Sequence, residues 1–160
     1  METKSSYQKN IYLENNFAGT IKSILGNYFI CQDAYQDQNQ GTDFLTFTMQ
    51  PFKIGVRLRR KCKNFEWYKN EFTIRWELPS GNETEIHKIR KGLVQYILYG
   101  FVDESEKKII RYFIGDLKVF NAHSPTLTPR IFANNPRDSD LAVYKISDFP
   151  KSFVVKCYER

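Results

Sequence analysis

Gly41–Arg60, GTDFLTFTMQPFKIGVRLRR, is the stretch from which the fold is predicted. Apolar and polar residues alternate on both sides of Pro51, and a period of two is typical of β-strands. Proline occurs at turns and strand edges, so it separates the two runs. We predict two strands joined by a tight turn, with an acid, Asp43, at the start of the first. In the second strand the two faces carry Ile54, Val56 and Leu58 on one side and Lys53, Gly55, Arg57 and Arg59 on the other.

The positive charge of the chain is concentrated in the same region. The 160 residues include 24 Lys and Arg against 18 Asp and Glu, a formal net charge of +6. A basic row on a strand is typical of a phosphate-binding surface. Lysine and arginine also protect exposed sheet edges from association, so the pattern leaves both roles open. The cations, with no acid among them, are Lys53, Arg57, Arg59, Arg60, Lys61 and Lys63.

Length and composition predict one domain over residues 1–160, with a polar, loose segment at 1–10. Aromatic residues make up 16% of the chain and charged residues 26%, which is a globular composition. Three separated cysteines without a CxxC motif favour reduced thiols and a cytoplasmic setting. The N-terminus lacks the apolar core of a signal peptide, and no apolar run is long enough to span a bilayer. We therefore expect no membrane partner; the oligomeric state stays open.

Periodicity predicts further elements around the central pair. Apolar residues spaced by three or four from Leu13 onward predict a helix, with Ser5 or Ser6 as its cap and Gly26 at its end. Residues 121–140, with three prolines, predict a long irregular loop. The fold class is α/β or α+β, with a central mixed sheet and a helix on each side. The other predicted elements are strands at Glu71–Leu78, Val94–Val102, Ile109–Ile114 and Leu141–Ile146, the middle two as a hairpin, and helices at Glu83–Lys91 and after Asp116.

The chemistry available to the chain is that of carboxylates, lysine and arginine. The sequence contains no phosphate-binding glycine loop and no HExxH zinc motif. Its two histidines, His87 and His123, are not placed beside a nucleophile, so acyl transfer is unsupported. The remaining groups suit magnesium-dependent phosphodiester cleavage, in which carboxylate oxygens hold the cation and the cation activates water.

The order of the elements resembles the PD-(D/E)XK, or restriction-endonuclease-like, superfamily, and in particular its phage and prophage members. The likeness covers roughly residues 10–120. It implies a restriction-endonuclease-like sheet and a nuclease-like protein of phage or mobile-element origin. The short motifs that carry it are Thr42-Asp43, Ile54 to Arg60, Phe72-Thr73-Ile74-Arg75, Thr84-Glu85 with Lys88-Ile89 and Gly92, Tyr99-Gly100, and Ile114 with Asp116-Leu117.

The resemblance also implies site residues, with one departure. Asp43 matches the metal-binding aspartate of the superfamily. The acid-x-lysine pattern of its second strand falls on Gly55-Val56-Arg57, where glycine offers no ligand and arginine does not titrate. A relocated carboxylate and a neighbouring lysine would have to substitute. The resulting predictions are Asp43, Arg57 and Lys53 as catalytic residues, and Asp43, Glu14 and Glu85 as ligands of Mg²⁺.

Two functions follow from these residues. One is a magnesium-dependent nuclease. The other is a non-enzymatic binding module, or an inhibitor of a host defence protein, that uses the basic hairpin to bind nucleic acid or that protein. Simpler structural roles stay open as well: Asp43 as a turn cap, Arg57 and Arg59 as solvated charges, and Glu85 as a surface partner of Lys88. The residues predicted to contact nucleic acid are Arg57, Arg59, Arg60, Lys61, Lys63 and Arg75.

Overall fold

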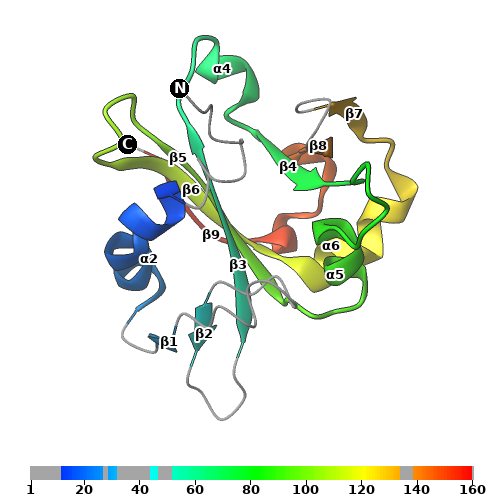
Figure 1. The fold of residues 1–160 in the computed structure, drawn as a ribbon, viewed down its shortest axis with the longest axis horizontal. Coiled ribbons are helices and arrows are strands. Elements are labelled where there is room, and N and C mark those ends of the chain that lie inside the picture. Colours follow the sequence, from blue (N-terminus) through cyan, green and yellow to red (C-terminus); the bar gives the residue numbers. More distant parts are fainter. Residues whose placement is uncertain (1–11, 27–28, 32–43, 47–51, 134–138, 160) are drawn as a thin grey trace.

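Two β-sheets and several short helices make up the computed structural model, which describes residues 12–26, 29–31, 44–46, 52–133 and 139–159 (Figure 1). The larger sheet has the strand order β1-β2-β3-β5-β6-β9, and the smaller one β4-β8-β7. The chain is therefore α+β, as predicted. The predicted loose segment 1–10 lies outside the described residues.

In the six-stranded sheet, β3 and β5 are parallel and all other neighbours are antiparallel. The antiparallel pairing of β2 with β3 confirms the two predicted strands as neighbours, while the predicted tight turn between them lies outside the described residues. The pairing of β5 with β6 confirms the predicted hairpin. The strands are β1 (Phe29–Cys31), β2 (Phe44–Thr46), β3 (Lys53–Arg60), β5 (Tyr96–Val102), β6 (Ile109–Asp116) and β9 (Val154–Glu159).

The three-stranded sheet is antiparallel and consists of β4 (Glu71–Arg75), β7 (Arg130–Ala133) and β8 (Asp140–Lys145). Its presence corrects the prediction of one central sheet, because the strand at Glu71 pairs with β8 and not with β3. It also corrects the predicted irregular loop at 121–140, which contains β7. Pro129 lies directly before β7, where a missing N–H costs no ladder hydrogen bond.

The helices begin and end at local signals. The N-terminal helical region, residues 12–16 and α2 (Ala18–Leu25), ends at Gly26, whose φ of 93° favours glycine. Asp116 caps α6, as predicted, because its carboxylate accepts the N–H groups of Lys118 and Val119 at 2.7 and 3.2 Å. The remaining helical segments are α4 (Phe65–Tyr68), α5 (Glu85–Arg90), α6 (Leu117–His123), η1 (Ser124–Thr126), η2 (Ile146–Asp148) and η3 (Lys151–Phe153).

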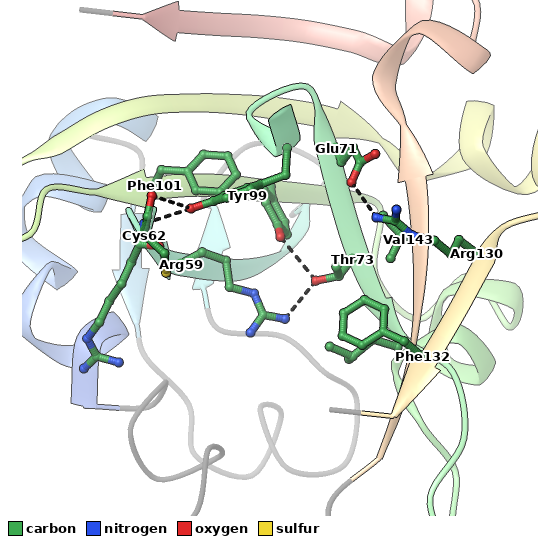
Figure 2. Close-up of a pocket in the computed structure, with 12 residues that line it drawn as sticks. Arg59, Cys62, Glu71, Thr73, Tyr99, Phe101, Arg130, Phe132 and Val143 are labelled. Atoms are coloured by element: carbon green, nitrogen blue, oxygen red, sulfur yellow. Dashed lines mark hydrogen bonds and ion pairs between the residues drawn. The ribbon is translucent and has the colours of Figure 1, made fainter. Parts of the chain in front are cut away.

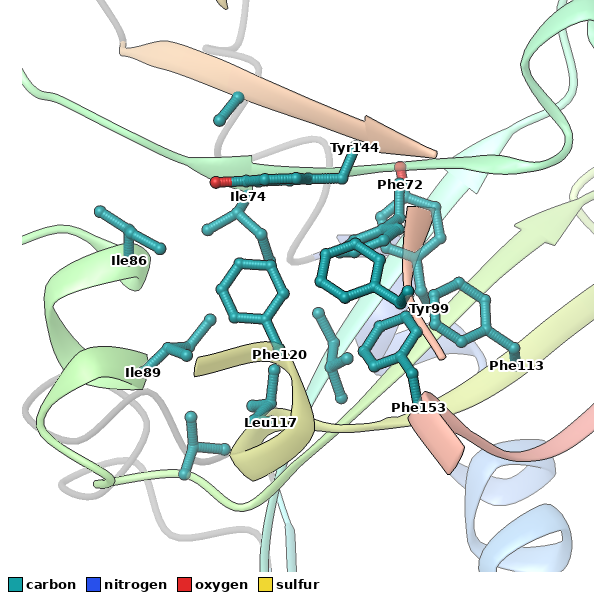
Figure 3. Close-up of a cluster of buried hydrophobic side chains, with 14 of the residues drawn as sticks. Phe72, Ile74, Ile86, Ile89, Tyr99, Phe113, Leu117, Phe120, Tyr144 and Phe153 are labelled. Atoms are coloured by element: carbon teal, nitrogen blue, oxygen red, sulfur yellow. The ribbon is translucent and has the colours of Figure 1, made fainter. Parts of the chain in front are cut away.

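Two hydrophobic cores cover the two faces of the larger sheet. The N-terminal helix packs Leu13, Phe17 and Ile21 against the face of β3 that carries its apolar residues. On the other face, α5, α6 and the smaller sheet enclose an aromatic cluster around the fully buried Phe72 (Figures 1 and 3). The rings nearest Phe72 are those of Tyr99, Phe113, Phe120, Tyr144, Phe149 and Phe153.

Candidate functional site

The polar face of β3 turns toward the smaller sheet. Burial alternates along the strand, with Ile54, Val56 and Leu58 in the helix-side core. Successive side chains of a strand point to opposite faces, so Arg57 and Arg59 must lie on the side of β4 and α5. The predicted row of cations is therefore placed between the two sheets.

Arg57 forms an interior ion pair. Its Nη2 lies 2.5 Å from Oε2 of Glu85 on α5, and their side chains are 12% and 22% exposed. The same carboxylate oxygen accepts the backbone N–H of Arg75 at 3.0 Å. Burial disfavours the charged form of Arg57, but Glu85 and then Glu14 outweigh it and raise the pKa of Arg57 above its ordinary value. Arg57 stays charged and is neutralised inside the protein.

The predicted metal ligands are brought together only in part. Glu14, on the N-terminal helix, is half-buried, and its charge acts on Arg57, as the charge of Glu85 does. Asp43 lies outside the described residues. Within those residues, no cluster of three His, Cys, Asp or Glu side chains could hold a metal ion. Lys53, at the start of β3, is half-buried, and its backbone N–H donates to Gln95 Oε1 at 2.8 Å.

Arg59 reaches from the larger sheet to the smaller one. Its Nη2 donates to Thr73 Oγ1 on β4 at 2.8 Å, and Tyr99 OH of β5 lies 3.2 Å from the same hydroxyl (Figure 2). Among the described residues, no carboxylate forms an ion pair with Arg59. Because a guanidinium has five N–H donors, this contact leaves Arg59 donor capacity for a ligand.

An open pocket of about 490 Å³ surrounds this contact. Figure 2 shows Arg59, Cys62, Tyr99 and Phe101 on one side, from β3 and β5 and the segment after β3, and Thr73, Arg130 and Phe132 of the smaller sheet on the other. The volume falls within the range of small-ligand sites. The full lining is Arg59, Arg60, Cys62, Tyr68, Glu71, Thr73, Tyr99, Phe101, Arg130, Phe132, Leu141 and Val143.

The lining carries more positive than negative charge. Arg60 pairs with Glu106 in the turn between β5 and β6, and Arg130 pairs with Glu71 at 3.0 Å. Of the four, Arg130 is the most open to solvent, with 70% of its side chain exposed. Three guanidinium groups and one carboxylate thus line the pocket, and an anion would be favoured there.

The segment after β3 contains three aromatic residues with different surroundings. Phe65 is buried and anchors α4, and the ammonium of Lys61 lies 5.7 Å from its ring centre. Tyr68 accepts the N–H of Cys62 at 2.8 Å and lines the pocket. Trp67 is 82% exposed, and Lys63, four residues earlier in the chain, is exposed as well. This segment therefore extends the basic and aromatic surface beyond the pocket.

Sequence reasoning missed Arg130 and Phe132 because it treated their segment as a loop. The signal was a β-branched residue, Ile131, followed by an aromatic one, Phe132, between a proline and two asparagines, which is typical of a short strand bounded by turn residues. Arg75, by contrast, was predicted as a nucleic-acid contact but is half-buried at the end of β4, where its backbone N–H binds Glu85.

Comparison of the chain with protein-family models, curated proteins and solved structures gave no match. Within the described residues, no helix has the length and apolar character needed to cross a membrane.

Proposed function

We propose that this chain binds nucleic acid through the pocket between its two sheets and the basic segment that follows β3, on a restriction-endonuclease-like scaffold. The observation that carries the proposal is the position of Arg59, whose guanidinium enters an aromatic-lined pocket without a carboxylate partner among the described residues. Cations next to exposed aromatic rings supply the two contacts that single-stranded and irregular nucleic acids need, phosphate pairing and base stacking.

The scaffold part of the proposal is supported by the order of elements. A helix precedes the antiparallel strands β1, β2 and β3, and α5 lies on the crossover to the parallel strand β5. The resemblance implies an aspartate at the start of a strand, and in the sequence Asp43 is the residue directly before β2.

Binding is favoured over cleavage by the state of Glu85. One of its oxygens already accepts two donors, from Arg57 and Arg75, and so has little capacity left for Mg²⁺. A specific observation nevertheless supports a magnesium-dependent nuclease as the second candidate. Glu14 is the helix carboxylate that the resemblance implies as a metal ligand, and its charge acts on Arg57, the cation implied for the second strand.

The test is fluorescence anisotropy with labelled oligonucleotides between about 50 and 200 mM salt. We expect affinity to fall with salt, and Arg59→Ala to weaken binding and to reduce the slope of log K against log salt by about 0.7 for a single strand. Lys118→Ala, which removes an exposed cation on α6, is the matched control and should leave both unchanged. Equal affinities of the two variants would refute the proposal.

The same samples separate binding from cleavage. Incubation with Mg²⁺ should leave the oligonucleotide intact if the chain is a binding module. Cleavage that requires Mg²⁺ and is lost in Asp43→Ala would establish the nuclease instead.

A further inference from the structure

The apolar lining of the pocket suits one unstacked group of a polymer better than the side of a duplex. Its apolar floor is formed by Phe101, Leu141 and Val143, which are 3%, 3% and 7% exposed. A base that is paired and stacked in a duplex cannot reach such a floor unless it is first unstacked, which costs free energy. A single strand offers bases that are already free to enter.

Strand β7 supplies the two contacts that one nucleotide needs. Phe132 pairs in register with Leu141, and Arg130 with Val143, so both side chains share the pocket face of the smaller sheet. Alternate residues of a strand are about 7 Å apart. A ring and a cation at this spacing can engage the base and the phosphate of the same nucleotide.

A hydrogen-bonded group that joins the two walls supplies polar atoms for the edge of a base or for a second phosphate. Arg59, Thr73 and Tyr99 are linked by hydrogen bonds, which hold the guanidinium in place across the gap (Figure 2). A pocket with an apolar floor, an aromatic ring at its mouth and a few oriented donors is the usual composition of a small-ligand site.

We propose that the nucleic acid bound by this chain is single-stranded, and that one unstacked base occupies the pocket against Phe132 while Arg59 and Arg130 hold its phosphates. This inference deepens the proposed function and rests on it. It assigns a stacking role to Phe132.

The chain contains a matched control for Phe132. Phe132 and Tyr158 are 42% and 41% exposed, and each lies on an outer strand, β7 of the smaller sheet and β9 of the larger. Both can be changed to alanine with a similar loss of exposed aromatic surface. Of these two residues, Phe132 lines the pocket and Tyr158 does not.

The experiment measures the affinity of both variants for a short single-stranded oligonucleotide and for the duplex of the same sequence. We expect Phe132→Ala to weaken single-strand binding by about 5- to 150-fold, the range found for loss of one base–aromatic stack, and Tyr158→Ala to change it less than twofold. The wild-type protein should prefer the single strand. A nucleoside 5′-monophosphate should displace the oligonucleotide at a concentration at least about tenfold lower than ribose 5-phosphate does, because only the former carries a base.

Failure of this inference is distinguishable from failure of the proposed function. If Arg59→Ala weakens binding but Phe132→Ala behaves like Tyr158→Ala, the protein binds nucleic acid and the base pocket is refuted. Equal affinity for the duplex, or equal competition by ribose 5-phosphate, refutes it too. If Arg59→Ala has no effect, the proposed function itself is refuted, and the inference with it.

Discussion

Removal of Glu85 tests whether the pair with Arg57 holds the interior together. Glu85 is the link between three elements, because its carboxylate contacts the guanidinium of Arg57 on β3 and the backbone of Arg75 on β4 while it belongs to α5. Glu85→Ala leaves the guanidinium of Arg57 charged, since the pKa of arginine lies far above any working pH. The variant must therefore keep this charge, without its hydrogen-bonded carboxylate, at a side chain that is 12% exposed.

The magnitude follows from the burial of both partners. Breaking a buried pair by removing one member costs about 3–5 kcal/mol, whereas surface pairs contribute about 0–1 kcal/mol. In a chain of this length each kcal/mol lowers Tm by about 2–4 °C. We expect Glu85→Ala to lower the free energy of unfolding by about 3–5 kcal/mol and Tm by about 6–20 °C.

The assay is urea unfolding followed by circular dichroism, with two comparison variants. Glu83→Ala removes a surface carboxylate that pairs with Lys91, and should leave the urea midpoint unchanged. The double variant Arg57→Met/Glu85→Leu replaces the pair by apolar groups and should be more stable than Glu85→Ala, because no charge is left without a partner. If Glu85→Ala lowers the free energy of unfolding by less than about 1 kcal/mol, the pair contributes no more than an exposed ion pair does, and the reasoning is refuted.

Two further predictions concern backbone positions and pH. Gly115→Ala should lower the free energy of unfolding in urea by about 1–3 kcal/mol, because the new Cβ would lie 2.9 Å from the ring of Phe153. Gly19→Ala should raise it by about 0.5–1 kcal/mol, because a Cβ there meets no atom within 4 Å and alanine favours the helix. The opposite order of stabilities would contradict the packing around these two glycines. The hydroxyl of Ser105 and nearby backbone N–H groups hold the pKa of Asp103 in the folded protein below its ordinary value. The ionised carboxylate therefore contributes its full stabilisation at pH values above the ordinary pKa. That stabilisation is lost as the pH falls through the lowered pKa of the folded protein. The stability difference between wild type and Asp103→Asn should therefore narrow on going from pH 6 toward pH 2, and a constant difference would exclude this linkage.

Local signals in the sequence were enough to predict much of the larger sheet. Alternation alone assigned the apolar and polar faces of β3, because side chains of a strand change sides at every residue. Gly26 and Asp116 marked a helix end and a helix start through backbone conformation and hydrogen bonding within a few residues. Such features depend on near neighbours in the chain, so they can be read without knowledge of the fold.

The sequence by itself thus determined which β3 side chains would be polar, and only the tertiary structure decided what they face. Arg57 meets Glu85 from 28 residues away, and Arg59 meets Thr73 from 14, so one cation is neutralised and its neighbour lines a pocket. The strand that carries Thr73 was predicted, but its place in a second sheet depends on β8, about 70 positions further along the chain. Periodicity describes the environment that a side chain prefers; the group that lies opposite it is set by how distant segments pack.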